Sequence, residues 1–397
     1  MKIRKSDLYV LLIVLFPICA LAEGYLSYYD EVIAIIGITS LLLQLTNKRT
    51  TKEVNIIAGL LTVITVIGLI SNINSRLISN PFPIFVDLLS LWKPFACLWL
   101  FRKVCLDTRK CAYIVRRLSS LAKVTIYFVF ITALVQQFVD IGAAGLNNTS
   151  YLGLKQFGFF WNNSIVTGWL LFGCLLVLAA NNEKHLVRYF VISIVPMLLT
   201  FSSLVYCWII VAVFMYVILK RDEVFKIRYI IIIAIAVSLF TLADITKYFL
   251  DVNSPRMLFI QYGIKTANTY FPVGSGFATY GTDMAARYYS PLYQLYGWSN
   301  LWTLGTSGKF LNDVFFAGIL GQFGWFGFGL YLLCLLQLFK SINTKQLSKE
   351  ERVLSLATVI TISVVMIASG AAKTIMGVFV FAVLGIVSSR TSQTDSR

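Results

Sequence analysis

The sequence contains a single histidine among 397 residues, and only 13% of its residues are charged. That histidine, His185, falls in a polar segment that we expect to be a surface loop. The sequence also contains no glycine-rich Walker loop, no HExxH motif and no Ser-His-Asp set. Any chemistry must therefore proceed without imidazole, which argues against acyl transfer through a histidine base and against zinc catalysis.

Acidic residues are also scarce, at 18 against 34 basic residues, which gives a formal net charge of +16. In a soluble protein this excess would suggest a nucleic-acid partner. Here 58% of the residues are hydrophobic and the mean hydropathy is +0.78, whereas about a quarter of the residues in a soluble domain are charged. The composition indicates an integral membrane protein, with no nucleic acid as partner.

Apolar stretches long enough, or nearly long enough, to cross a bilayer recur along the chain. They predict an all-α polytopic membrane protein with about 12 transmembrane helices. Whether residues 187–219 and 353–388 each form one span or two is left open by their length. The expected spans are 8–23, 31–46, 54–71, 83–101, 121–139, 164–180, 188–201, 203–219, 229–246, 313–339, 353–369 and 371–388.

Basic residues orient these spans, because lysine and arginine in short loops stay on the cytoplasmic side. With the N-terminus inside and an even number of spans, the basic segments and the C-terminal tail all fall inside. The first apolar stretch shows no secretory cleavage site and is expected to be a retained span. One membrane domain over 1–397 then has two large outer loops, 140–163 and 247–312. None of the seven cysteines lies in either loop, which argues against disulfides there.

The longer outer loop contains an unusual run of glycines, tyrosines and charges. Pro255 is a favourable first residue for a helix, and the apolar residues after it suit the membrane surface. Gly274 and Gly276 suit a tight turn or a close backbone approach to a ligand. Exposed N–H groups of such a turn bind anions.

Thr282 is a candidate N-cap for a short helix, on which Asp283 and Arg287 lie four residues apart. The spacing fits a surface ion pair, and it also fits an arginine that faces a phosphate or pyrophosphate. Asp313 either caps the following helix or faces the site. The loop's tyrosines fit stacking on sugar rings or an interfacial aromatic belt; they are Tyr280, Tyr288, Tyr289, Tyr293 and Tyr296.

Two lysines outside this loop are also candidates. Lys93 is expected near the middle of the membrane, where a charge usually has a partner or a water-filled cavity. Asp87, six residues away, is poorly aligned with it on a straight helix. Lys155 is an exposed lysine of the other large outer loop unless that loop folds over the first.

Several of these segments together resemble a known family. They are the basic inner loops, the segment from Gly153 to Phe159, Arg256 in the late outer loop, "PVGSGFATYGTDMAARYYSPLYQLYG" and "NDVFFAGILGQFGWFG". In this order they are similar to the bacterial Wzy polysaccharide polymerases of the O-antigen ligase and polymerase superfamily. The likeness covers most of the chain in expected topology but only residues 256–324 in motif.

The resemblance implies a glycosyltransferase with a bundle similar to the GT-C enzymes and a cavity under the long periplasmic loop. Such enzymes transfer a growing glycan from undecaprenyl pyrophosphate to the next lipid-linked repeat unit, and no cofactor is expected. It implies that Arg256 and Arg287 bind the pyrophosphate and that Asp283 or Asp313 acts on the acceptor hydroxyl. Lys155, Gly274, Gly276, Tyr280, Tyr288 and Tyr293 are the expected substrate contacts, with no metal.

The resemblance further implies the bacterial inner membrane, cytoplasmic termini, a chain-length regulator and a flippase as partners. The large outer loop lacks the histidine that marks the related lipid A core ligases. The chain also has Leu204 after Ser203, where many members have a basic residue, so that phosphate contact is either missing or supplied by Lys155 or Arg76. A ligase-type transferase and a lipid-linked oligosaccharide flippase or other transporter remain the alternatives.

Overall fold

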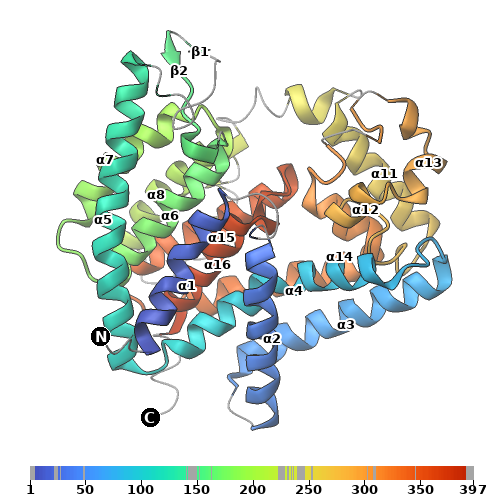
Figure 1. Ribbon diagram of the computed structural model, residues 1–397, viewed down its shortest axis with the longest axis horizontal. Coiled ribbons are helices and arrows are strands. Elements are labelled where there is room, and N and C mark those ends of the chain that lie inside the picture. Colours follow the sequence, from blue (N-terminus) through green and yellow to red (C-terminus); the bar gives the residue numbers. More distant parts are fainter. Residues whose placement is uncertain are drawn as a thin grey trace.

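The computed structural model describes most of the chain. The described ranges are 5–21, 28–47, 50–139, 150–151, 153–161, 163–221, 246–251, 254–301, 303–306, 310–344 and 346–389, with isolated positions between them. These residues are mostly helical, and the one strand pair among them is a short antiparallel hairpin of β1 (Ser150–Tyr151) and β2 (Leu154–Lys155). The hairpin projects at the top left in Figure 1, whereas α11 and α13 lie at the right.

Long apolar helices dominate the chain. In order they are α1 (Lys5–Cys19), α2 (Tyr29–Thr46), α3 (Lys52–Ser75), α4 (Pro81–Val104), α5 (Thr108–Phe138), α6 (Ser164–Ala180), α7 (Leu186–Leu199), α8 (Ser203–Arg221), α14 (Phe315–Ile342), α15 (Lys349–Ala368) and α16 (Ile375–Ser388). Shorter elements are η3 (Phe159–Trp161), η4 (Thr246–Leu250), α11 (Pro255–Thr269), α12 (Asp283–Arg287), α13 (Pro291–Leu295), η5 (Trp298–Asn300) and η6 (Ala371–Lys373).

Seven of the described helices are long and apolar enough to cross a membrane, namely α2 to α5, α8, α14 and α15. Three shorter apolar helices, α6, α7 and α16, accompany them. The chain is thus a helical membrane protein by length and composition, while the count of about twelve spans stays a prediction. The two long runs that the sequence left open each contain two helices. The expected span 229–246 falls mostly outside the described residues.

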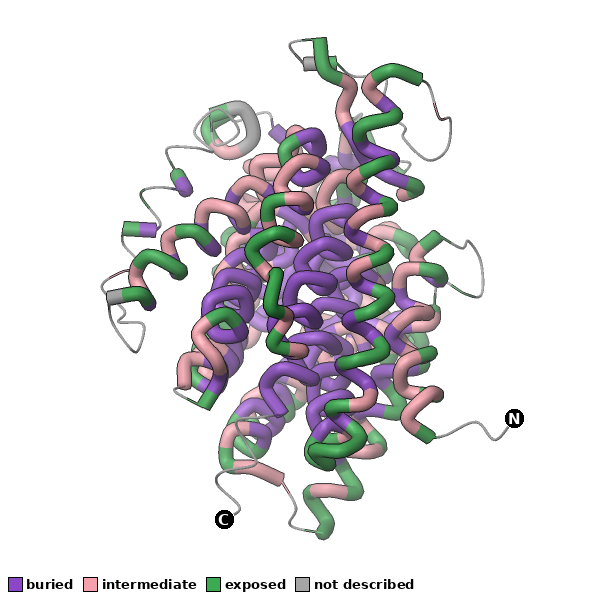
Figure 2. Tube along the Cα trace, turned by 90° about the vertical axis from the view of Figure 1, so that its left-hand side faces the viewer, coloured by how far each residue is buried: buried purple, intermediate pink, exposed green. Residues whose placement is uncertain are grey.

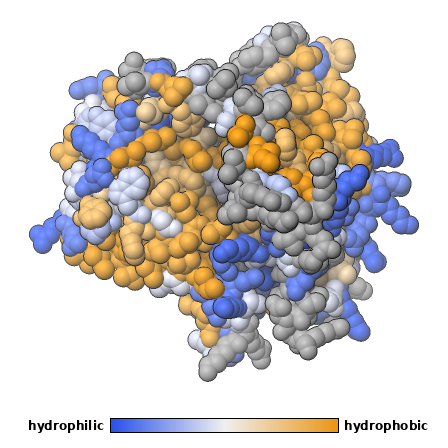
Figure 3. Space-filling view, turned by 180° about the vertical axis from the view of Figure 1, so that it is seen from behind, coloured by the Kyte–Doolittle hydropathy of each residue, from blue (hydrophilic) through white to orange (hydrophobic). Residues whose placement is uncertain are grey.

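Helix α16 forms the centre of the bundle. It is apolar on every side and buried along almost its whole length against α4, α6 and α1, as expected for a helix without a polar face. In Figure 2 the buried residues fill the middle of the bundle and the exposed ones follow its outer side. Seen from behind, the surface is broadly hydrophobic, with hydrophilic groups gathered toward its edges (Figure 3). This distribution suits a protein surrounded by lipid.

The described residues between 254 and 314 form a separate polar and aromatic layer, which we call the capping segment, packed against α14 through α11. Pro255 starts α11, as predicted. The Thr282 hydroxyl accepts a hydrogen bond from the Ala285 N–H and so caps α12, as also predicted. The segment has its own core around Phe259 and Trp298. It is therefore a folded layer rather than an extended loop.

The glycine run of the capping segment inserts into a break in α14. Gly324 has non-helical backbone angles (φ 65°, ψ −171°), which leave the carbonyl groups before it without regular helical partners. The Ser275 N–H donates to the Gly321 carbonyl at 3.0 Å, and the Gly276 N–H donates to the Gln322 carbonyl at 2.8 Å. These N–H groups supply hydrogen bonds to the carbonyl groups at the break in α14, so they are not free to bind an anion in this conformation.

Replacing Gly276 by alanine should destabilise this junction by about 2–3 kcal/mol, because φ is positive there and a Cβ would overlap Asn72. Gly329→Ala on α14 is the matched control, since nothing lies within 4 Å of the Cβ it would add. We expect that control to be neutral or slightly stabilising. Thermal unfolding of both variants in detergent measures the difference. Equal unfolding midpoints would show that the contact between Gly276 and α14 does not stabilise the protein.

Candidate functional site

A cavity of about 270 Å³ lies between the membrane helices and the capping segment. Its walls come from the start of α2, from α4, from α12 and from the connection of η6 to α16. The charged residues that line it are Asp30, Glu31, Asp87, Lys93, Asp283, Arg287 and Lys373. So many charges around one space inside an otherwise apolar protein indicate a functional site rather than packing.

Lys93 lies in the middle of α4 and is 5% exposed. Its Nζ lies 2.6 Å from Asp30 Oδ2 and 2.8 Å from Glu31 Oε1, both at the first turn of α2. The sequence analysis predicted a partner or a cavity for this lysine, and the structure provides both. Asp87 is not its ion-pair partner. The pairing fixes the start of α2 beside the cavity.

Arg287 closes α12 and is exposed to the cavity. Its Nη1 donates a hydrogen bond to the Tyr28 hydroxyl at 3.0 Å. This hydrogen bond, and more weakly the nearby carboxylate of Asp283, raise the pKa of Arg287. The guanidinium is therefore always charged, and its remaining N–H groups are available to a ligand.

Asp283 begins α12 and also lines the cavity, where its side chain is exposed although protein surrounds it. Its Oδ1 accepts a hydrogen bond from the Asn312 side-chain amide. Desolvation opposes ionisation of this carboxyl group, but Lys373 and Asn312 outweigh it and lower the pKa of Asp283. Asp283 is thus ionised at neutral pH. It is not paired directly with Arg287, so the simple surface ion pair is not what the structure shows.

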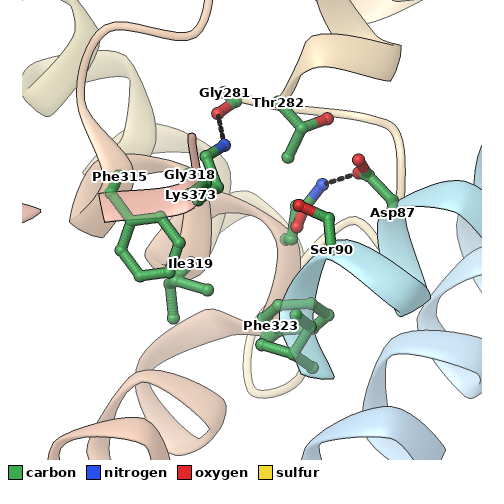
Figure 4. Close-up of a pocket in the computed structure, with 11 residues that line it drawn as sticks. Asp87, Ser90, Gly281, Thr282, Phe315, Gly318, Ile319, Phe323 and Lys373 are labelled. Atoms are coloured by element: carbon green, nitrogen blue, oxygen red, sulfur yellow. Dashed lines mark hydrogen bonds between the residues drawn. The ribbon is translucent and has the colours of Figure 1, made fainter. Parts of the chain in front are cut away.

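Asp87 on α4 and Lys373 at the end of η6 lie deeper (Figure 4). Asp87 is 5% exposed, and its Oδ2 accepts hydrogen bonds from the Ala278 N–H and from the Gln322 amide, each at 2.7 Å. Lys373 is 7% exposed, and its Nζ donates to the Gly281 carbonyl at 3.5 Å. Both residues line the 270 Å³ cavity and a smaller one of about 20 Å³ beside it.

The cations of the cavity differ in whether they pair with a carboxylate. Two carboxylates pair with Lys93. In the described part of the chain, neither Arg287 nor Lys373 has a carboxylate oxygen within 4.0 Å. These two cations are therefore the groups best placed to bind an anionic ligand, and carboxylates on the opposite wall are placed to accept hydrogen bonds from hydroxyl groups.

Arg256 and Asp313, two of the predicted catalytic residues, pair with each other instead of lining either cavity. Arg256 Nε donates to Asp313 Oδ2 at 2.8 Å, and both side chains are about a quarter exposed, at 24% and 23%. The pair joins the first turn of α11 to the start of α14. Of the four predicted catalytic residues, the structure therefore brings only Asp283 and Arg287 into the cavity.

The tyrosines of the capping segment divide into two kinds. Tyr280 and Tyr293 are fully buried; the Tyr280 hydroxyl donates to the Phe259 carbonyl at 2.6 Å, and Tyr293 stacks on Trp298. Burial raises the pKa of both hydroxyl groups. Neither ring has a face open to a sugar in this conformation. Tyr288 is 48% exposed and remains accessible.

Lys155, Gly274 and Gly276 also lie apart from the cavity lining. Lys155 is in the β1–β2 hairpin, where its backbone N–H and carbonyl pair with the Gln137 side chain of α5. This hairpin is at the opposite end of the molecule from α12 (Figure 1). The two glycines serve the junction with α14 described above.

Residues of the cavity wall that sequence reasoning missed include Tyr28, Asp30, Glu31, Ser90 and Lys373. The first three lie at or just before the start of the expected span 31–46, and Lys373 lies within the expected span 371–388. A lysine three residues into the expected span 371–388 was a signal, because a cation there is costly without a role. Asp30 and Glu31 gave no comparable signal, since acidic residues are common at helix starts.

No protein-family model matches the chain, and no curated protein sequence matches it significantly. The function of the chain is therefore inferred from the geometry of the site and from the motif resemblance.

Proposed function

We propose that this protein is a polysaccharide polymerase of the Wzy type. In this proposal it transfers a growing glycan from undecaprenyl pyrophosphate to the non-reducing end of the next lipid-linked repeat unit. The observation that carries the proposal is the charged cavity beneath the capping segment. Its walls include α12, which lies within the motif that resembles the family.

The chemistry of the cavity supports a glycosyl transfer with a phosphate leaving group. As the bond from the sugar to the pyrophosphate breaks, negative charge develops on the leaving oxygen. A fixed cation aimed at that oxygen lowers the barrier, most of all in a site that excludes water. Arg287 suits this role, because it is exposed to the cavity, permanently charged and equipped with a planar fork of donors. Lys373 adds a second positive charge to the same space.

The apolar surface of the helices supports delivery of a lipid-linked substrate from the bilayer. The cavity borders the start of α2, whose outer face carries exposed residues such as Val32 and Ile35. A polyprenyl chain can remain in the lipid while its pyrophosphate and sugars enter the polar space. The proposal places this cavity at the outer face of the inner membrane, with cytoplasmic termini. A flippase would supply the repeat units and a chain-length regulator would limit the product.

A transporter is the second candidate, because two observations favour it. The buried group of Lys93, Asp30 and Glu31 is of the kind found along ion pathways. The interrupted helix α14 is a feature that many carriers share at their binding sites. Against transport, the free cations face a cavity covered by a folded capping segment rather than a site between two related halves. A ligase-type transferase would use the same cavity chemistry.

The glycan profile of cells that lack the protein distinguishes these functions. A gel should show a ladder reduced to one repeat on the acceptor, and expression of the intact protein should restore the long chains. Complete loss of surface glycan would contradict polymerisation and indicate ligation or translocation. Single-repeat lipid carriers that accumulate on the inner leaflet would identify a flippase.

A further inference from the structure

The small cavity beside the main one has the size of a single hydroxyl group. Its volume is about 20 Å³, and it shares Asp87, Ser90 and Lys373 with the main cavity. A space of this size holds one water-sized group, provided that polar partners surround it. A hydroxyl group carried by a ligand in the main cavity can therefore reach this space.

The partners of such a hydroxyl group are in place. The hydrogen bonds that Asp87 accepts from Ala278 and Gln322 both end on Oδ2. The Thr282 hydroxyl also hydrogen-bonds with this carboxylate. Because a carboxylate has about four lone-pair sites, Oδ1 can still accept a hydrogen bond from an acceptor hydroxyl group. Figure 4 shows Asp87, Ser90 and Thr282 around one space, with Lys373 across from them.

Lys373 is a buried cation with unused hydrogen-bonding capacity. An ammonium group has three donors, yet its hydrogen bond among the described residues is one of 3.5 Å to the Gly281 carbonyl. Phe315 contacts the same ammonium group at 5.5 Å from the ring centre. Burial of a cation with so little coordination is costly unless a ligand completes it.

We propose that this small cavity is the subsite for the acceptor hydroxyl group and that Asp87 is the general base. The inference rests on the proposed glycosyl transfer and deepens it. The acceptor O–H bond breaks and its proton passes to Asp87 Oδ1. The oxygen forms a bond to the anomeric carbon of the donor sugar, while the bond from that carbon to the pyrophosphate oxygen breaks with its electron pair. No further reactant is needed.

The two cations then have different tasks. Lys373 faces the acceptor oxygen and stabilises the negative charge that grows there as the proton leaves. Arg287, on the other wall of the main cavity, faces the leaving pyrophosphate. Asp283 is less suited to act as the base, because it lines the main cavity and not the small one.

Backbone and side-chain donors from distant parts of the chain fix the orientation of the Asp87 carboxylate. Ala278 has a positive φ of 60°, which is strained for a residue other than glycine. Its N–H donates to Asp87 across a sequence separation of 191 residues. The Gln322 amide, two residues before the break in α14, fixes the same oxygen. The carboxylate is thus oriented by two elements besides its own helix.

The test measures polymerisation by purified protein in nanodiscs, with lipid-linked repeat units extracted from cells that lack it. Asp87→Asn should lower kcat by at least about 100-fold and leave the KM for the repeat unit within threefold. In Asp87→Ala, which should lose activity in the same way, added sodium formate should restore part of the rate, because a small carboxylate fits the space that the truncated side chain leaves. Asp313→Asn is the control, since its carboxylate pairs with Arg256 outside both cavities.

A second pair of variants tests the subsite without altering any charge. Ser90 lines both cavities. Ser90→Val fills the small cavity and should reduce polymerisation at least about tenfold, whereas Ser120→Val, the same change at an exposed serine of α5, should retain the rate of the unmodified protein. This pair keeps the test decisive if Asp87→Asn does not fold.

The outcomes separate this inference from the proposed function. If the unmodified protein polymerises and Asp87→Asn or Ser90→Val does so at the same rate, the acceptor subsite is refuted while polymerisation stands. A loss in folded Asp87→Ala that formate does not relieve would also count against the base. If the unmodified protein forms no polymer from these repeat units, the proposed function itself fails.

Discussion

Replacing Arg287 by alanine should reduce the synthesis of long glycan chains by about 100- to 1,000-fold, with normal amounts of protein in the membrane. This is the loss typical when one preorganised donor to a developing negative charge is removed. Arg287 lines the main cavity and is oriented by the hydrogen bond from its Nη1 to the Tyr28 hydroxyl at 3.0 Å. The side chain is exposed, so its loss should cost little stability. The chain-length distribution on a gel, normalised to membrane protein level, measures the effect.

Two further variants make this result specific. Arg287→Lys keeps the charge but loses the planar fork of donors, so it should retain only part of the activity. Arg256→Ala should behave differently, because Arg256 is bound to Asp313 outside the cavities. We expect it to lower the amount of folded protein more than the glycan made by each molecule. Unchanged chain lengths in Arg287→Ala, or an equal catalytic loss in folded Arg256→Ala, would contradict this assignment.

Local patterns in the sequence predicted much of the helical framework. Hydropathy located the apolar helices, because a long apolar run has few alternatives to a helix in lipid. The starts of α11 and α12 followed from Pro255 and Thr282, since a helix start depends on residues that are adjacent in the chain. These predictions needed no knowledge of the tertiary structure.

The cavity was less accessible to prediction, because its residues are distant in sequence. Lys93 meets Asp30 across 63 positions, and Asp87 meets Ala278 across 191. The hydrogen-bond partners of the glycine run were equally hard to predict. Its N–H groups suggested an anion site, but they bind carbonyl groups that become available only because α14 breaks at Gly324. The tyrosines suggested sugar stacking, yet the capping segment needs Tyr280 and Tyr293 for its own core.

The buried charges on α2 and α4 lead to the second large effect. Replacing Lys93 by methionine keeps most of the side-chain volume and removes the ammonium group. Asp30, which is 1% exposed, and Glu31 would then remain beside each other without a counter-charge. Removal of one partner from a buried ion pair typically costs about 3–5 kcal/mol. We expect a large drop in thermal stability in detergent and in the amount of protein in the membrane.

Neutralising the two carboxylates as well should restore the stability that Lys93→Met loses. In a triple variant with Lys93→Met, Asp30→Asn and Glu31→Gln, no uncompensated charge is left, so much of the lost stability should return. Lys103→Met, at the end of α4, is the matched control, because that lysine is exposed and its ammonium group, among the described residues, bonds to the Ser40 hydroxyl. A rescued triple variant that also regains polymerisation would show that the cluster only anchors α2. A stable triple variant without activity would show that its charges act in the cavity, and a Lys93→Met protein as stable as the control would refute the buried pairing.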